Sequence, residues 1–313
     1  MNLAFLFPGQ GAQKVGMGKS LADNFASARE TFEQADQALG EPLSRLCFEG
    51  PEDALRLTAN TQPAILTVSV AAWRVLTDEL GLRPTLAAGH SLGEYSALVA
   101  VGALRFEQAV RAVRRRGALM QAACPPGLGA MAALIGLEPA AVEEVCAQAT
   151  EGAEFVAPAN FNAPGQIVVA GYAAAVNRAL ELAKARGSKL SVMLNVSAPF
   201  HCSLMRPARE GMAPVLAELQ VGELTAGVVA NVDGRINRDP NRVVPLLLEQ
   251  ITAPVRWDQS MQTMAQAGIE QAIEIGPGRV LSGLMRRINR QLPVHSMEEA
   301  ASLPGLRSAL AQV

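Results

Sequence analysis

The stretch Ala87-Ala88-Gly89-His90-Ser91-Leu92-Gly93-Glu94-Tyr95 joins an apolar run to a helix-forming segment, and it is the most informative motif of this 313-residue chain. The apolar run at 86–88 predicts a buried strand, and residues 94–101 predict a helix. Between them, Gly89 and Gly93 flank Ser91 in the spacing G-x-S-x-G. A serine at a sharp strand-to-helix turn has a strained backbone, and glycines on either side avoid clashes and leave its hydroxyl exposed. Ser91 is therefore the candidate nucleophile.

Composition excludes several classes of protein. Half of the residues are apolar and the net charge is −2, so the chain can bury a sizeable core and has no general affinity for nucleic acid or an anionic membrane. The N-terminus lacks a basic region, and no apolar run approaches the ~20 residues that span a bilayer. Four scattered cysteines and three histidines do not form a zinc motif. We expect a cytoplasmic protein with reduced thiols, no metal, and no nucleic-acid or membrane partner.

The order of strands and helices predicts two domains. Residues 127–196 read as strand, helix, strand, strand, helix and strand, which is the ferredoxin-like unit. Residues 1–126 and 197–313 alternate strands with helices, which favours a mostly parallel sheet covered by helices. The small domain is thus predicted to be inserted into a large α/β domain. Within the large domain we expect one helix over 21–39 and another over 61–80, with Pro63 in its first turn.

A nucleophilic serine needs a base, and only three histidines are available. His90 adjoins Ser91 on the turn and should point away from it, and His295 lies in an apolar strand. His201 follows Ala198-Pro199-Phe200, where the chain returns from the insert to the large domain. Ligand sites favour such crevices, so His201 is the candidate base. No acid falls between serine and histidine as in a hydrolase triad, so a neutral acceptor is expected to orient the histidine. That arrangement suits either a ping-pong transferase or a slow hydrolase.

A run of arginines lies on the helix predicted over 106–123. A period of 3.6 residues cannot place Arg111, Arg114, Arg115 and Arg116 on one face, so one of them is expected to point inward.

Several ordered motifs together resemble the malonyl-CoA:acyl carrier protein transacylase family of bacterial type II fatty acid synthesis, over nearly the whole chain. The motifs are Phe7-Pro8-Gly9-Gln10-Gly11-Ala12-Gln13, Gly89-His90-Ser91-Leu92-Gly93-Glu94, Arg116-Gly117 with Met120-Gln121, Asn160-Phe161-Asn162, Ala198-Pro199-Phe200-His201-Cys202, Gln250 before Pro254-Val255-Arg256-Trp257, and Gly276-Pro277-Gly278. The resemblance implies an α/β-hydrolase-like large domain with a ferredoxin-like insert. Ala12 replaces a serine found in many relatives, and we know of no chemical role for that position.

The resemblance also implies a role for each site residue. Ser91 would carry the malonyl ester, His201 would be the general base and then the acid, and the backbone carbonyl of Gln250 would orient His201. The remaining roles would be an oxyanion hole from the amides of Gln10 and Leu92, a carboxylate clamp at Arg116, an acyl pocket walled by Met120 and Phe200, and a pantetheine cleft lined by Asn160 and Asn162.

The implied substrates are malonyl-CoA and acyl carrier protein, with no bound cofactor and a monomeric enzyme. Three alternatives remain: an enzyme that loads malonyl groups for a polyketide synthase or a malonate decarboxylase, a serine esterase or thioesterase, and an inactive scaffold.

Since acyl carrier proteins are acidic, docking of the carrier needs a local basic patch. The candidate clusters are Arg111, Arg114 and Arg115; Lys184 and Lys189; and Arg286, Arg287 and Arg290.

Overall fold

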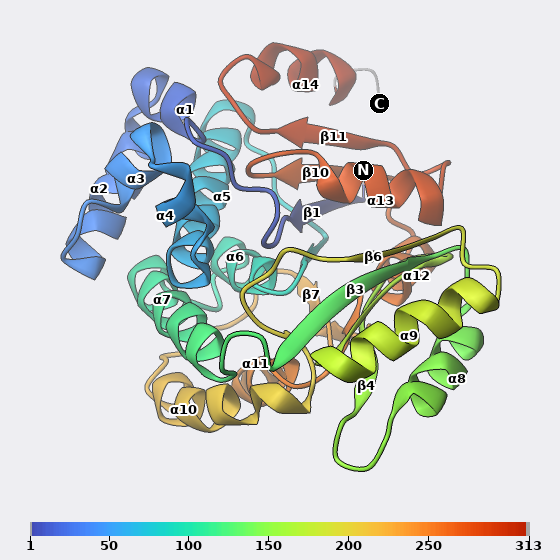
Figure 1. Cartoon of the computed structure of the whole chain (residues 1–313). Helices are drawn as coiled ribbons and strands as arrows, with labels where there is room; N and C mark the ends of the chain where they lie inside the picture. Colours follow the sequence, from blue (N-terminus) through green and yellow to red (C-terminus); the bar gives the residue numbers. More distant parts are fainter. Residues whose placement is uncertain (1, 311–313) are drawn as a thin grey trace.

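Two β-sheets, each covered by helices, form the framework of the protein (Figure 1). The computed structural model describes residues 2–310. The larger sheet has the spatial order β11 (Val294–Met297), β10 (Gln271–Ile275), β1 (Leu3–Phe7), β2 (Leu86–Gly89), β7 (Gly227–Val229) and β8 (Ile236–Asn237). All neighbours in it are parallel except β7 and β8. The expected mixed α/β fold is confirmed.

Strand β1 shows how the larger sheet is buried on both faces. Leu3, Phe5 and Phe7 pack into one apolar core, and the alternate residues Ala4 and Leu6 pack into another. This alternation follows from the two-residue period of a strand.

The helices outside the small sheet are α1 (Lys19–Asn24), α2 (Ala26–Leu39), α3 (Leu43–Glu49), α4 (Glu52–Arg56), α5 (Thr58–Leu80), α6 (Gly93–Ala100), α7 (Phe106–Ala122), α10 (Arg206–Ala217), α11 (Val243–Gln250), α12 (Trp257–Gln266), α13 (Val280–Ile288) and α14 (Ser302–Leu310), with short 3-10 turns η1 (Ser203–Met205) and η2 (Pro240–Arg242).

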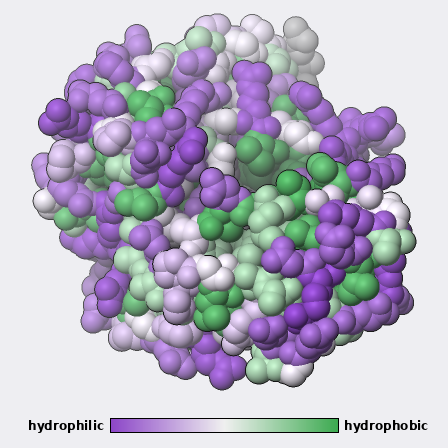
Figure 2. Space-filling model, viewed as in Figure 1, coloured by the Kyte–Doolittle hydropathy of each residue, from purple (hydrophilic) through white to green (hydrophobic). Residues whose placement is uncertain are grey.

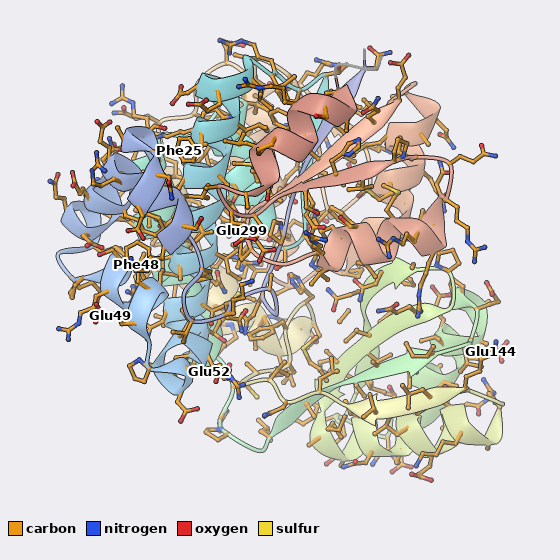
Figure 3. All side chains as sticks on the ribbon, turned by 90° about the horizontal axis from the view of Figure 1, so that it is seen from above. Phe25, Phe48, Glu49, Glu52, Glu144 and Glu299 are labelled. Atoms are coloured by element: carbon orange, nitrogen blue, oxygen red, sulfur yellow. The ribbon has the colours of Figure 1, made fainter. Side chains whose placement is uncertain are left out.

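The smaller sheet forms a separate lobe with its own apolar core. Its order is β6 (Leu190–Met193), β3 (Gly129–Ile135), β5 (Gln166–Tyr172), β4 (Val156–Ala163) and β9 (Val255–Arg256), with helices α8 (Pro139–Ala149) and α9 (Ala173–Ala185). Seen from above, this lobe with the labelled Glu144 lies on the opposite side from the labelled Phe25, between α1 and α2, and Phe48 on α3 (Figure 3). Strand β9 pairs in parallel with β4, so a strand from outside 127–196 completes this sheet.

Two helical expectations were wrong in detail. The segment 21–39 forms two helices, because Phe25 is extended at φ −130° and ψ 130° between α1 and α2. Helix α5 begins at Thr58, so Pro63 lies in its second turn and not in the first. Proline has no N–H to donate to Ala59, whose carbonyl oxygen instead accepts a 2.8 Å bond from Arg114 Nη1. No helix among residues 2–310 is long and apolar enough to cross a membrane.

Candidate active site

The turn between β2 and α6 presents Ser91 at the carboxyl edge of the larger sheet. Ser91 has φ 52°, a left-handed conformation that is strained for a residue with a side chain. The neighbouring backbone is too close for side chains at 89 and 93. A Cβ on Gly89 would lie 1.9 Å from the carbonyl carbon of Gly93, and one on Gly93 would lie 2.2 Å from the oxygen of Phe7. The G-x-S-x-G spacing is therefore a packing requirement of this turn.

Both backbone polar groups of Ser91 are held by buried side chains. Its N–H donates to Asn231 Oδ1 at 2.7 Å, and its carbonyl oxygen accepts from Gln250 Nε2 at 3.0 Å. Asn231 also donates to the carbonyl of Gly89 at 2.8 Å, which ties it to the end of β2. These bonds fix the strained turn from outside it.

His201 lies within hydrogen-bonding distance of the serine hydroxyl. Its Nε2 is 2.8 Å from Ser91 Oγ, and its Nδ1 is 2.9 Å from the carbonyl oxygen of Gln250. A carbonyl oxygen only accepts, so Nδ1 carries the proton and Nε2 accepts from the serine hydroxyl. The structure thus brings together the three residues expected to be catalytic, with the orienting group on the backbone of Gln250.

The charge state of His201 favours a base. The ring is buried, and burial together with the nearby Arg116 guanidinium lowers the pKa of His201 to about 3. Both effects disfavour a second positive charge. At neutral pH the ring is therefore uncharged and able to take the proton of Ser91.

Arg116 is the arginine of the run that points inward, and it is 1% exposed. Its Nη1 donates to Gln62 Oε1 at 2.8 Å, and its Nη2 donates to Gln250 Oε1 at 2.8 Å and to Ser91 Oγ at 3.1 Å. Its Nε has no partner among residues 2–310. A buried guanidinium with a spare donor beside a serine hydroxyl is suited to an anionic group close to the reacting centre.

Two backbone amides near Ser91 are free to bind an oxyanion. The N–H groups of Gln10 and Leu92 make no hydrogen bond within the part of the chain that the structure describes, and both residues line the cavity at Ser91. The loop that carries Gln10 lies against the turn, since a Cβ on Gly9 would be 2.4 Å from the oxygen of His90. Leu92 precedes helix α6, whose N-terminal dipole also favours negative charge there.

A single cavity lies between the two sheets and contains nine of the ten expected site residues; the tenth, Gln250, contacts it through Ser91 and His201. Its lining consists of Gly9, Gln10, Gln62, His90, Ser91, Leu92, Arg116, Met120, Met131, Asn160, Asn162, Gln166, Val168, Leu194, Val196, Phe200, His201, Val280, Leu281 and Leu284. Figure 2 shows a hollow on the front face of the molecule with apolar atoms along its edge. The structure thus places Met120, Phe200, Asn160 and Asn162 around Ser91 as a mixed apolar and polar wall.

The other two histidines have different partners. His90 Nε2 donates to Asn162 Oδ1 at 2.8 Å, and burial lowers the pKa of His90. His295 is half-buried on the edge strand β11 and lies 3.2 Å from Gln271 Oε1. Neither contacts Ser91 Oγ, so His201 is the one histidine of the three that lies within hydrogen-bonding distance of the serine hydroxyl.

Sequence reasoning missed three residues of the site. Gln62 on α5 orients Arg116, Asn231 holds the N–H of Ser91, and Glu94 accepts hydrogen bonds from the backbone N–H of Asn231 and from Gln250 Nε2, both at 2.9 Å. A signal existed for Asn231, which follows the carboxyl end of a parallel strand, where ligand sites gather. Gln62 interrupts an apolar helical face, a weaker signal. Among residues 2–310 no three His, Cys, Asp or Glu side chains form a group that could hold a metal ion.

Comparisons with known proteins agree on one family. Residues 4–312 match the acyl transferase domain family. A malonyl CoA-acyl carrier protein transacylase from Salmonella typhimurium is 46% identical over 96% of this chain and 97% of its own length. The crystal structure of an acyl carrier protein S-malonyltransferase from Vibrio cholerae superimposes with a TM-score of 0.95 at 46% identity, covering 98% of this chain and 100% of that one. A malonyl-transacylase in complex with its type II PKS acyl-carrier protein gives a TM-score of 0.94 at 44% identity, with 97% and 98% coverage.

Proposed function

Because this chain belongs to the family of malonyl CoA-acyl carrier protein transacylases, we propose that it transfers the malonyl group from malonyl-CoA to the phosphopantetheine thiol of acyl carrier protein. The transfer follows a ping-pong course through a malonyl ester on Ser91. The enzyme is an acyltransferase, and its two substrates use the same cavity in turn.

The observation that carries the proposal is the pair of contacts made by Ser91 Oγ. The hydroxyl is bonded both to a neutral histidine and to a buried guanidinium, at 2.8 Å and 3.1 Å. The first contact supplies a base for nucleophilic attack. The second places a positive charge where the acyl group of a Ser91 ester would lie, so the geometry favours an acyl chain that carries a carboxylate.

In the first half-reaction, the Ser91 hydroxyl gives its proton to His201 Nε2, and Oγ bonds to the thioester carbonyl carbon of malonyl-CoA. The amides of Gln10 and Leu92 donate to the oxyanion of the tetrahedral intermediate. The carbon–sulfur bond then breaks, and the CoA sulfur takes the proton from His201. The transient imidazolium is stabilised through Nδ1 by the carbonyl of Gln250.

The second half-reaction uses the same groups. The carrier thiol gives its proton to His201, and its sulfur bonds to the ester carbonyl carbon. The oxyanion again binds at Gln10 and Leu92. Ser91 Oγ leaves and recovers the proton from His201, so atoms and charge balance over the cycle. Asn160 and Asn162 line the part of the cavity assigned to the pantetheine arm, and Met120 and Phe200 wall the acyl group.

We further propose the finer fold assignment. The larger sheet, with its serine turn after β2, supports an α/β-hydrolase-like large domain from residues 1–126 and 197–313. In the insert at 127–196, neighbouring strands are antiparallel in the order fourth, first, third, second, which supports a ferredoxin-like domain. We place the boundaries at the segments that join β3 and β6 to the large domain.

The reaction proposed here needs no metal or bound cofactor, since the nucleophile, base and oxyanion donors all belong to the chain. We also propose a monomer, since the proposed nucleophile, base and oxyanion donors complete one site within a single copy of the chain. We propose a cytoplasmic location, where the four free cysteines would stay reduced. The malonyl product supplies fatty acid elongation. Loading of a polyketide carrier is the second candidate, since the similar malonyl-transacylase described above was solved with a type II PKS acyl-carrier protein.

Steady-state kinetics test the proposal. Reciprocal plots against malonyl-CoA at several concentrations of holo-carrier should be parallel, and CoA release beyond one equivalent should require the carrier. Continued release of CoA and free malonate without carrier would identify a thioesterase instead.

A further inference from the structure

Glu94 is a buried carboxylate beside the reacting groups, yet it contacts neither the substrate cavity nor the serine hydroxyl. Its side chain is 2% exposed on α6, three residues after Ser91. One oxygen, Oε2, accepts both the backbone N–H of Asn231 and Nε2 of Gln250, each at 2.9 Å. Burial of a carboxylate is costly, so a carboxylate kept at this position calls for an explanation.

The two partners of Glu94 are the two side chains that hold the backbone of Ser91. Asn231 accepts from the serine N–H, and Gln250 donates to the serine carbonyl. One carboxylate oxygen therefore links both contacts of the strained turn. Through Gln250 it also acts on the histidine, because the backbone carbonyl of the same residue orients His201.

Glu94 is also a carboxylate close enough for its charge to act on Arg116. Within residues 2–310 the Arg116 guanidinium forms no ion pair with a carboxylate; its acceptors are neutral oxygens of Gln62, Ser91 and Gln250. The amide of Gln250 lies between the two charges, with Nε2 donating to Glu94 and Oε1 accepting from Arg116. A malonyl carboxylate bound at Arg116 would share this cation with Glu94, and the two anions would repel each other.

We propose that Glu94 is a positioning residue that holds Ser91 through Asn231 and Gln250, and that its negative charge moderates the preference of Arg116 for a carboxylate-bearing acyl group. This inference rests on the proposed malonyl transfer. It assigns two separable effects to one residue: hydrogen-bond acceptance sets the rate with any acyl group, and charge sets the ratio between malonyl and acetyl groups.

The ionisation of the Glu94 carboxyl is shifted towards neutral pH. Burial raises the pKa of Glu94 to about 7, against the opposing effects of its hydrogen bonds and of Arg116. The charged or titratable groups that face it are Arg116 on α7, Asp233 after β7 and Tyr95 on its own helix. Above this pKa the carboxylate is ionised and competes with malonyl for Arg116. Below it the carboxyl is neutral and the competition disappears.

The test compares Glu94→Gln, Glu94→Ala and Glu274→Gln with the wild type. Glutamine keeps an acceptor oxygen without charge, and alanine removes both. Glu274 is a matched control, since it is also fully buried and accepts hydrogen bonds from Leu281, Ser282 N and Ser282 Oγ, but it lies on β10 and does not contact Ser91. The measurement is kcat/KM for malonyl-CoA and for acetyl-CoA with saturating holo-carrier, from about pH 6 to about pH 8.

At about pH 8 the ratio of kcat/KM for malonyl-CoA to that for acetyl-CoA should be roughly tenfold higher in Glu94→Gln than in the wild type. This is the size of effect expected from repulsion between two nearby charges in a partly polar interior. Towards about pH 6 the wild-type ratio should rise to that of the variant, whose own ratio stays flat. Glu274→Gln should keep the wild-type ratio throughout. Glu94→Ala should lose kcat for both acyl groups.

Three results would overturn the inference: an unchanged or lower ratio in Glu94→Gln at about pH 8, a wild-type ratio that does not change with pH, or full kcat in folded Glu94→Ala. The wild-type pH series decides the charge effect even if a variant fails to fold. A wild type that transfers no malonyl group at all would instead reject the proposed function.

Discussion

The ring of His201 is oriented by the backbone carbonyl oxygen of Gln250, which lies 2.9 Å from its Nδ1. A carbonyl is a neutral acceptor, so the imidazolium that forms during transfer gains less stabilisation than it would from a carboxylate. Arg116, which lies close by, disfavours that cation further. In the proposed mechanism, the imidazolium must therefore return its proton rapidly to a leaving group, and each half-reaction supplies such a group.

Replacement of the base tests its assignment. His201→Ala should slow both acylation by malonyl-CoA and transfer to carrier, on the order of 10²-fold or more, as expected for a lost general base. His295→Ala is the matched control, because that ring is half-buried on β11 and outside the cavity. The measurement is single-turnover kinetics of each half-reaction. If His295→Ala stops acylation in a folded protein while His201→Ala does not, the two assignments are reversed.

The acid limb of the rate profile follows from the pKa of His201. Burial and Arg116 lower that pKa to about 3, below its usual value. The ring therefore stays neutral, and able to accept the proton of Ser91, as pH falls through the range where a free histidine gains a proton. The rate of Ser91 acylation at saturating malonyl-CoA should therefore show no loss with a midpoint near pH ~6.5. A tenfold fall for each pH unit below that midpoint would mean that His201 titrates normally.

Arg116 should decide acyl selectivity. Arg116→Ala should lose malonyl transfer, lowering the malonyl-to-acetyl ratio of kcat/KM by roughly 10- to 100-fold, since a hydrogen-bonded ion pair is lost. Arg116→Lys should recover part of the ratio, because an ammonium lacks the planar fork. An unchanged ratio in Arg116→Ala would mean that some other group recognises the acyl carboxylate.

The three basic clusters differ in how many of their side chains are already paired and in how close they lie to the cavity. These differences indicate which cluster the carrier binds. Arg114 is already bonded to Asn60, Ala59 and Glu41, and Lys184 pairs with Glu181. On α13, however, Arg287 Nη1 donates to Gln166 Oε1 at 3.1 Å, and Gln166 lines the cavity. We therefore expect the acidic carrier to dock at the cluster of Arg286, Arg287 and Arg290, which are exposed.

Charge reversal of Arg286, Arg287 and Arg290 should raise KM for the carrier and spare acylation by malonyl-CoA, and added salt should have a similar effect on the wild type. Reversal of Arg111 and Arg115, which are exposed on α7, is the matched control. If carrier KM responds to neither reversal, docking is not electrostatic at these clusters.

Short sequence patterns were enough to predict several features of the fold and of the site. The turn around Ser91 could be predicted because its glycine spacing reflects contacts within a few residues and with β1. Helical geometry predicted that one arginine of the run at 111–116 points inward, and the resemblance to a known family identified it as Arg116, which is buried. The break at Phe25 could not be predicted, since it has neither glycine nor proline, and Pro63 was misplaced because the helix start at Thr58 has no side-chain cap.

What sequence could not provide was long-range pairing. Asn231 meets Ser91 across 140 positions, and Gln62 meets Arg116 across 54. Strand β9 joins the smaller sheet through two residues, too few for a periodic signal. The network of Glu94, Asn231 and Gln250 depends on three elements meeting behind the turn, and only the folded chain brings them together.

The proposed mechanism requires a malonyl ester on Ser91. Intact-protein mass spectrometry should show the wild type gaining the mass of one malonyl group after mixing with malonyl-CoA, and losing it when holo-carrier is added. Ser91→Ala should remain folded, because this partly exposed hydroxyl contributes little to the core, and should gain no mass. A malonyl adduct that persists in Ser91→Ala, or a wild-type adduct that carrier does not remove, would contradict the assignment.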